Sequence, residues 1–346
     1  MQLHALLLAT ASIAARIPLE KRASPSALSD VTIFDPPSDY NVPRTLYARN
    51  VQLPNGDLLA TWENYSPEPP AVYFPIYRSS DYGQTWTEIS QVQDTVNGYG
   101  LRYQPFLYYL NESIGSYDAG TLLLAGNSIP TNLSSTHIDL YASTDEGITW
   151  EFVSNIAAGG EAEPDNGLTP VWEPFLMAYN GKLICYYSDQ RDNTTYGQKL
   201  VHQLPNGEYL YIYEYGSYFD TTTYSFPLYY RRSSDPEDFA SATGERLVVS
   251  SGTEPTSSPY VTWTSYGGTN GTIIASSGSY STLFINQALG EGEWTEISCS
   301  EGTSYSRSLR VLSESNEQYL LVNGAGVSGG TSNSVTVTVV DLGDSL

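Results

Sequence analysis

A short phrase that occurs twice constrains the fold of this 346-residue chain more than any other feature. The phrase Ser-x-Asp-x-Gly-x-x-Trp reads SSDYGQTW at 79–86 and STDEGITW at 143–150, with the two serines 64 residues apart, and a degraded copy, SSDPEDF, occupies 233–239. In such a phrase, known as an Asp-box, the Asp carboxylate accepts backbone N–H bonds within a tight turn, Gly takes the φ > 0 position and Trp packs between sheets. We therefore predict β-hairpins here, with structural and not catalytic aspartates.

A second repeat, a turn followed by an apolar strand, predicts the architecture. Its six copies are NGDLLATWE (55–63), AGTLLLAGN (119–127), NGKLICYYS (180–188), NGEYLYIYE (206–214), NGTIIASSG (270–278) and NEQYLLVNG (316–324). Helical periodicity is nearly absent, so the chain is predicted to be all-β, and six copies indicate a six-bladed β-propeller. DVTIF (30–34) is expected to pair with SVTVTVVDL (334–342), which closes the ring and removes free sheet edges.

The spacing of this repeat is irregular at one place. From Gly120 to Gly181 there are 61 residues and from Gly207 to Gly271 there are 64, but from Gly181 to Gly207 there are only 26. Roughly 30 residues are therefore missing, enough for an Asp-box turn and two strands. We expect QKLVHQ (198–203) to be the third strand of blade three, followed directly by the second strand of blade four, with the seam near Gln203-Leu204.

The N-terminus predicts export. MQLHALLLATASIAA is an apolar run that ends in small residues, as in a secretory signal peptide, and Lys21-Arg22 is typical of a dibasic processing site. A buried strand is the alternative interpretation of this run. The expected organisation is therefore a signal peptide and pro-segment at 1–22 and one propeller domain at 23–346. Glycosylation sequons support a secreted glycoprotein and begin at Asn64, Asn111, Asn132, Asn193 and Asn270.

Composition narrows the possible partners. A formal net charge of −23 argues against nucleic acid, and no later apolar run is long enough to cross a membrane. The 29 tyrosines suit half-buried strands and also suit stacking on sugar rings. Of the two cysteines, Cys185 is interpreted as a buried thiol in preference to a bridge with Cys299. No cluster of His, Cys and carboxylates demands a metal.

Alignment of the repeats predicts which residues line the central funnel. The ends of the second strands and the starts of the first strands meet on one face. Glu63, Asn127, Ser188 and Glu214 are at second-strand ends, and the equivalent segments QPFL (104–107) and EPFL (173–176) place Gln104 and Glu173 at first-strand starts. Glycoside hydrolysis needs two carboxyl groups, which makes Glu173 and Glu214 the catalytic candidates. The alternative is that both glutamates have a structural role only, as strand-end carboxylates with hydrogen-bond partners in the fold.

Further residues are candidates for binding a substrate. Glu63 is a third carboxylate, with an expected binding or electrostatic role. Arg49, Arg102, Arg307 and Arg310 fall near first strands, and a sialidase would need three convergent arginines to hold the substrate carboxylate, a cluster that the sequence neither proves nor excludes. The predicted substrate-binding set is Arg49, Glu63, Gln104, Asn127, Ser188, Tyr260 and Arg307.

Several phrases together resemble those of glycoside hydrolase family 93, the fungal exo-α-1,5-L-arabinanases. They are VWEPFL, YYSDQRD followed by QKLVHQ, LPNGEYLYIYEYG and LYYRRSSDPEDF. The resemblance implies a monomeric six-bladed propeller of sialidase type that releases arabinobiose from the non-reducing end of linear plant cell-wall arabinan, with retention of configuration and without a cofactor. It implies that Glu173 and Glu214 are the catalytic pair, and we favour Glu173 as the acid/base.

Two other hypotheses remain at this point. One is a sialidase or another exo-glycosidase on the same scaffold. The other is an inactive carbohydrate-binding propeller, because the missing segment is expected to leave an unpaired strand edge beside both glutamates.

Overall fold

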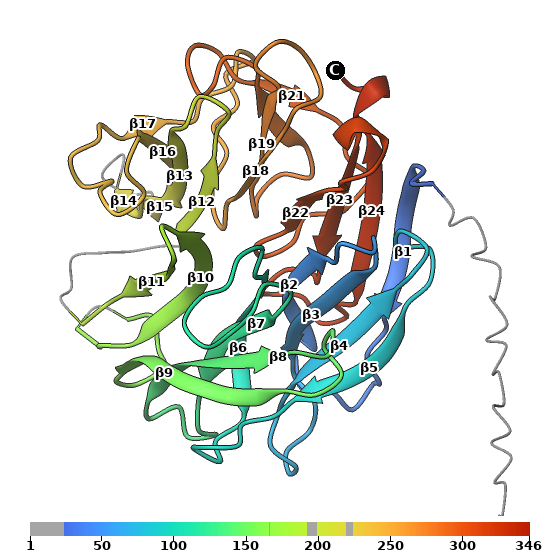
Figure 1. Ribbon diagram of the computed structural model, residues 1–346. Coiled ribbons are helices and arrows are strands. Elements are labelled where there is room, and N and C mark those ends of the chain that lie inside the picture. The colour runs from blue at the N-terminus through green and yellow to red at the C-terminus, as the bar shows by residue number, and fades with distance from the viewer. Residues whose placement is uncertain (1–23, 166, 192–198, 219–223) are drawn as a thin grey trace, which may run out of the picture.

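The computed structural model describes residues 24–165, 167–191, 199–218 and 224–346. The predicted signal peptide lies outside these residues. Figure 1 shows sheets arranged side by side around a common centre, which is the arrangement of a β-propeller. The described residues contain strands and two short 3-10 helices, Ser315–Glu317 and Leu342–Asp344, so the prediction of an all-β protein is confirmed.

Five of the sheets have four strands each. The first contains β2 (Thr45–Gln52), β3 (Leu58–Asn64), β4 (Phe74–Ser79) and β5 (Thr87–Val92), and the second contains β6 (Leu101–Tyr109), β7 (Leu122–Ser128), β8 (Thr136–Ser143) and β9 (Glu151–Gly159). Another contains β12 (Lys199–Gln203), β13 (Tyr209–Glu214), β16 (Leu228–Ser233) and β17 (Glu245–Arg246). The fourth contains β18 (Tyr260–Thr264), β19 (Thr272–Ser276), β20 (Leu283–Asn286) and β21 (Thr295–Ile297). The fifth contains β22 (Ser308–Val311), β23 (Tyr319–Gly324), β24 (Val335–Asp341) and β1 (Leu28–Phe34).

Between the second and the third of these sheets lies a sheet of only two strands, β10 (Val171–Tyr179) and β11 (Lys182–Asp189). A small separate ribbon pairs β14 (Ser217–Tyr218) with β15 (Tyr224–Ser225). The prediction of six full blades is therefore not confirmed: the propeller has five four-stranded blades, and the two-stranded sheet β10–β11 stands between two of them.

The inner strands close the ring. Neighbouring first strands contact each other in the order β2, β6, β10, β12, β18, β22 and back to β2. The N-terminal strand β1 pairs with β24, with Val31 opposite Val337, so the predicted closure by the two chain ends is confirmed. Apolar side chains fill the spaces between neighbouring sheets, as where Phe74 and Ile76 of one blade pack with Leu122 and Leu124 of the next.

The prediction for QKLVHQ is wrong. Strand β12 pairs along its whole length with β13, from Lys199 opposite Tyr213 to Gln203 opposite Tyr209, so it is the first strand of its own blade and not the third strand of the preceding one. The turn explains this pairing: the N–H of Leu204 donates to the carbonyl of Glu208 at 2.7 Å, just as the N–H of Leu53 donates to Asp57 at 2.8 Å in the first blade. Gln203-Leu204 is thus the start of a regular hairpin, and the shortened spacing of the repeat falls between β11 and β12, where the described residues contain no further strand.

Both intact Asp-box turns are confirmed. In the first, Asp81 accepts the N–H and the hydroxyl of Thr85 at 2.9 and 2.6 Å, and Gly83 has φ +95°. In the second, Asp145 accepts the same groups of Thr149 at 2.8 and 2.7 Å. The carboxylates are occupied by their own turns, which supports their structural role. Both cysteines are free and half-buried, and no helix among the described residues is long and apolar enough to cross a membrane.

Candidate active site

One residue at the start of each of five inner strands has an unusual backbone conformation. The φ angles are +54° at Tyr47, +58° at Gln104, +57° at Glu173, +46° at Ser258 and +57° at Ser306. The corresponding position of the sheet that begins with β12 falls outside the described residues. Non-glycine residues rarely adopt φ > 0, and a bulge of this kind redirects a side chain. The pairing register slips at the same points in β2, β6 and β10. Gln104 and Glu173 are therefore equivalent, as the sequence predicted.

The ends of the second strands lie beside these bulges. Glu63 is opposite Leu46, Asn127 is opposite Tyr103 and Ser188 is opposite Trp172. Glu214 is the last residue of β13. The repeat alignment thus placed the four residues correctly at the same end of their sheets.

Hydrogen bonds join three sheets at this end. The hydroxyl of Tyr65 donates to Glu63 Oε2 at 2.7 Å, and Glu63 Oε1 accepts the backbone N–H of Gln104 at 3.0 Å. The side-chain oxygen of Gln104 accepts both the amide of Asn127 and the backbone N–H of Glu173, each at 2.9 Å. Gln104 therefore links a carboxylate of the first blade to the backbone of Glu173 in the two-stranded sheet.

The Glu173 carboxyl group is buried, with 6% of the residue exposed, and is held by two hydroxyl groups. Ser188 Oγ donates to Oε2 at 3.1 Å, and the hydroxyl of Tyr305 donates to Oε1 at 3.3 Å. Glu214 is less buried, and its Oε2 accepts the backbone N–H of Ser258 at 2.7 Å. Tyr305 was missed by the sequence analysis, because its contact with Glu173 depends on the bulge at Ser306, which the sequence does not mark.

The two funnel carboxyl groups with the deepest burial resist ionisation. Burial raises the pKa of Glu173 well above its ordinary value and the negative charge of Glu214 raises it further, while Ser188, Tyr305 and Arg49 act in the opposite direction. Burial likewise raises the pKa of Glu63 to about 7, against the hydrogen bonds from Tyr65 and Gln104 and the charge of Arg49. Glu173 is thus able to hold a proton at a pH at which an ordinary glutamate has lost it.

Arg49 packs against Tyr260 and is close enough to Glu63 and Glu173 for its charge to act on both carboxyl groups. Arg49 is 1% exposed and donates to the carbonyl and hydroxyl oxygens of Ser306 at 2.8 and 2.7 Å. Its guanidinium carbon lies 3.8 Å from the ring centre of Tyr47 and 5.2 Å from that of Tyr260. Arg49 therefore supplies positive charge from within the fold.

The other three arginines do not join it. Arg307 is fully buried and donates to the carbonyls of Tyr280, Ser281, Thr282 and Glu301, which fixes loops and leaves no obvious role in contacting a substrate. Arg102 binds both oxygens of Glu68 at 2.9 Å, and Arg310 donates to Asn50. Within the described part of the chain, the three-arginine cluster that a sialidase would require is therefore not assembled.

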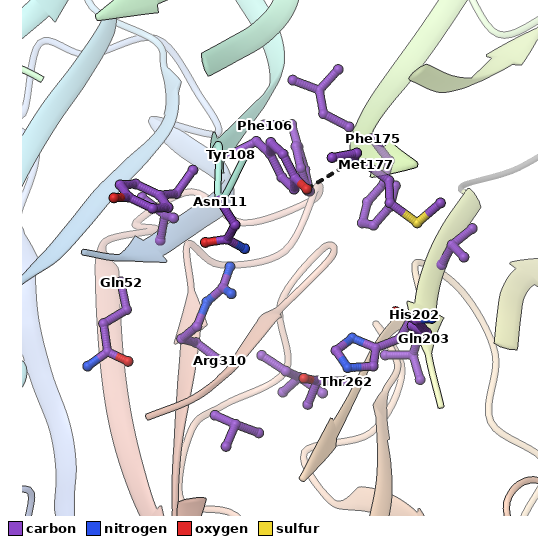
Figure 2. Close-up of a pocket in the computed structure, with 18 of the residues that line it drawn as sticks. Gln52, Phe106, Tyr108, Asn111, Phe175, Met177, His202, Gln203, Thr262 and Arg310 are labelled. Atoms are coloured by element: carbon purple, nitrogen blue, oxygen red, sulfur yellow. Dashed lines mark hydrogen bonds between the residues drawn. The ribbon is translucent and has the colours of Figure 1, made fainter. Parts of the chain in front are cut away.

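A cavity of about 890 Å³ lies elsewhere, at the end of the central channel where the turns between first and second strands meet (Figure 2). Of the predicted site residues only Tyr260 lines it. The size of this cavity does not make it the active site, because neither glutamate lines it: Glu173 lies near the start of β10 and Glu214 at the end of β13, whereas the cavity is lined by later residues of β10 and by the first residue of β13.

Fold and site together define the class: a β-propeller of sialidase type with buried, partnered carboxyl groups at one mouth. No protein-family model matches the chain, and no curated protein sequence does either. Solved structures do match. An α-L-arabinanase of Penicillium chrysogenum complexed with arabinobiose is 67% identical, with a TM-score of 0.92 over 93% of this chain and 100% of that chain. The GH93 α-L-arabinofuranosidase of Fusarium graminearum with arabinobiose is 48% identical, with a TM-score of 0.90 over 92% and 99%.

The chain belongs to glycoside hydrolase family 93. A more distant match is the Hadza microbial sialidase Hz136, which is 14% identical with a TM-score of 0.59 over 92% of this chain and 69% of that chain and shares the fold alone. The predicted family resemblance is confirmed, and the chain is a glycosidase of this family.

Proposed function

We propose that this protein is a secreted, retaining exo-α-1,5-L-arabinanase that releases arabinobiose from the non-reducing end of linear arabinan. The main support for the proposal is the Glu173 carboxyl group, which is buried between Ser188 and Tyr305 and whose pKa is raised by burial and by the charge of Glu214. The complexes of two similar enzymes with arabinobiose support the choice of substrate.

In the first step Glu173 acts as the general acid. It gives its proton to the glycosidic oxygen as the C–O bond breaks, so that the shortened arabinan leaves as an alcohol. A Glu214 oxygen attacks the anomeric carbon at the same time and forms a glycosyl ester with the arabinobiosyl unit. The backbone N–H of Ser258 holds Glu214 Oε2, which fixes the orientation of the nucleophile.

In the second step Glu173 changes from general acid to general base. Now ionised, it takes a proton from a water molecule, the water oxygen attacks the anomeric carbon, and the ester bond to Glu214 breaks to release arabinobiose. Two displacements at one carbon give net retention. Glu63, Gln104 and Asn127 bind or orient the sugar and the catalytic groups, and Arg49 contributes positive charge from below.

The test is product analysis with the full chain and linear arabinan. Wild-type protein is expected to release arabinobiose, and Glu173→Gln and Glu214→Gln are each expected to reduce kcat by on the order of 10²–10⁴-fold. Glu237→Gln, at an exposed position of the neighbouring blade, is the matched control and should keep full activity. Proton NMR of the first product should show the α anomer.

Three outcomes would contradict parts of the proposal. A folded wild-type protein without product would favour the inactive carbohydrate-binding propeller, and a version with a restored blade three would then be compared with it. Turnover of a sialoside instead of arabinan would favour a sialidase. A β anomer would exclude retention.

Export and assembly have their own measurements. After expression in a fungal host, the protein should appear in the medium with its N-terminus following Arg22, and light scattering should give the mass of a monomer. An intracellular product that retains Met1 would contradict secretion.

A further inference from the structure

The cavity at the far end of the channel is built by all the inner strands. Figure 2 shows its walls: Gln52 from β2, Phe106 and Tyr108 from β6, Phe175 and Met177 from β10, His202 and Gln203 from β12, Thr262 from β18 and Arg310 from β22. Its volume of about 890 Å³ is in the range of small-molecule sites, as is the combination of apolar walls with a few convergent polar groups.

Arg310 gives this cavity a positive charge. Its Nε and Nη2 donate to the side-chain and backbone oxygens of Asn50 at 3.5 and 3.2 Å. Arg78, Arg102, Arg232 and Arg246 are all paired with carboxylates, but Arg310 has no such ion pair among the residues that the structure describes. In a chain of net charge −23, a cation that faces a cavity without a carboxylate partner attracts an anion.

His202 approaches from the opposite wall (Figure 2). Burial and, to a smaller extent, the charge of Arg310 lower the pKa of its imidazole to about 4, while the charge of Glu317 acts in the opposite direction. At neutral pH His202 is therefore uncharged and offers one donor and one acceptor. The hydroxyl oxygen of Tyr108 accepts the N–H of Ala178 at 2.9 Å, which leaves the hydroxyl hydrogen available as a donor.

We propose that this cavity binds an acidic sugar, whose carboxylate pairs with Arg310 and whose hydroxyl groups bond to His202, Tyr108 and the amide of Gln203. The aromatic walls suit the apolar face of a sugar ring. Because Glu112 also lines the cavity, a single negative charge fits better than the multiple charges of a phosphate ester.

This site is separate from the glutamates. Neither Glu173 nor Glu214 lines the cavity, and of the predicted site residues only Tyr260, which packs against Arg49, reaches it. An acidic sugar in the cavity should therefore not compete with arabinobiose at the funnel. The proposal does not depend on the function proposed above.

Isothermal titration calorimetry of the full chain with D-glucuronate and D-glucose tests the proposed binding of an acidic sugar, because only D-glucuronate carries a carboxylate. Protein made in bacteria keeps Asn111, which begins a sequon, unmodified. We expect glucuronate to bind at least about tenfold more tightly than glucose, and Arg310→Gln to remove that advantage. Arg246→Gln, which breaks a surface ion pair with Glu254, is the matched control and should bind as the wild type does.

Thermal unfolding shows whether Arg310→Gln is folded. Asn111→Asp, at the exposed rim, is the second variant: an added carboxylate should weaken glucuronate and leave glucose unchanged. The proposal is overturned if folded wild-type protein does not bind glucuronate, if glucose binds equally well, if both variants keep wild-type affinity, or if arabinobiose displaces the bound acid.

Discussion

Sheet β6–β9 and sheet β10–β11 begin in the same way and end differently. Both start with a bulge, at Gln104 in one and at Glu173 in the other, followed by Pro-Phe-Leu. The first then has four strands, but the second stops at two. Among the described residues, the polar contacts of Glu173 nevertheless come from Gln104, Ser188 and Tyr305, which lie on first or second strands or next to them. The funnel is therefore assembled by the first and second strands of the sheets and the segments next to them.

The outer strands have a different effect. Strand β7 is paired on both sides and all of its residues are buried, whereas β11 is paired with β10 only and most of its residues are half-exposed. We therefore expect the short sheet to hold Glu173 in place but to be the less stable of the two sheets.

The largest effect on stability is expected when the facing rings of Phe106 and Phe175 are removed, one from each of the two sheets. Phe106→Ala should lower the free energy of unfolding by about 3–5 kcal/mol, because a buried ring leaves a cavity in a complete blade. Phe175→Ala should fall at the lower end of this range, since the two-stranded sheet can relax. Urea unfolding measures both, with Phe226→Ala, 37% exposed, as control. A larger loss for Phe175→Ala would reverse the interpretation.

Amide hydrogen exchange compares the two second strands directly. Amides of β11 should exchange on the order of 100-fold faster than those of β7, because among the described residues no strand pairs with the outer edge of β11. Mass spectrometry of peptides covering 122–128 and 182–189 gives the rates. Equal protection would mean that another part of the molecule covers the β11 edge.

Gln104 connects the two sheets, so its loss should affect the site more than the fold. In Gln104→Ala the amide of Asn127 and the backbone N–H of Glu173 lose their acceptor, and kcat/KM should fall about ten- to a hundredfold. Gln91→Ala, on the outer strand β5, is the control and should be neutral. Unchanged kinetics in Gln104→Ala would show that Glu173 is positioned without this link.

The smallest effect is expected at Ser188. Its hydroxyl stabilises the ionised form of Glu173, so Ser188→Ala should raise the pKa of that carboxyl group further. If Glu173 is the acid, the alkaline limb of the pH–rate profile moves to higher pH by about one unit. Asn127→Ala, at the equivalent position of the complete blade, should leave this limb in place, and a shift in both variants would contradict the assignment.

The sequence predicted those features that depend on local chemistry or on repetition. The Asp-box turns, the pairing of β1 with β24 and the equivalence of Gln104 with Glu173 all follow from motifs with a fixed conformation. The pairing of β12 was missed because a five-residue strand carries no mark of its neighbour. The clue was the repeated turn, LPNGD at 53–57 and LPNGE at 204–208, which joins first and second strands in both blades.

The residues that sequence reasoning misjudged depend on the tertiary structure. Nothing in the chain shows that the Arg307 guanidinium is occupied by four backbone carbonyls or that Tyr305 reaches Glu173. The bulges also have no sequence signature, because Tyr, Gln, Glu and Ser all occupy the same strained position. Their φ angles are imposed by the ring of inner strands and not by local preference.

That variety has a consequence for how such an enzyme can be altered. Four kinds of side chain, Tyr, Gln, Glu and Ser, occupy one backbone geometry at 47, 104, 173, 258 and 306, so the geometry does not depend on which residue is present. Specificity at the mouth can therefore be changed one position at a time while the strand ladder stays as it is. For enzyme engineering, the members of this set to keep fixed are Glu173 and Gln104, whose side-chain oxygen accepts the backbone N–H of Glu173.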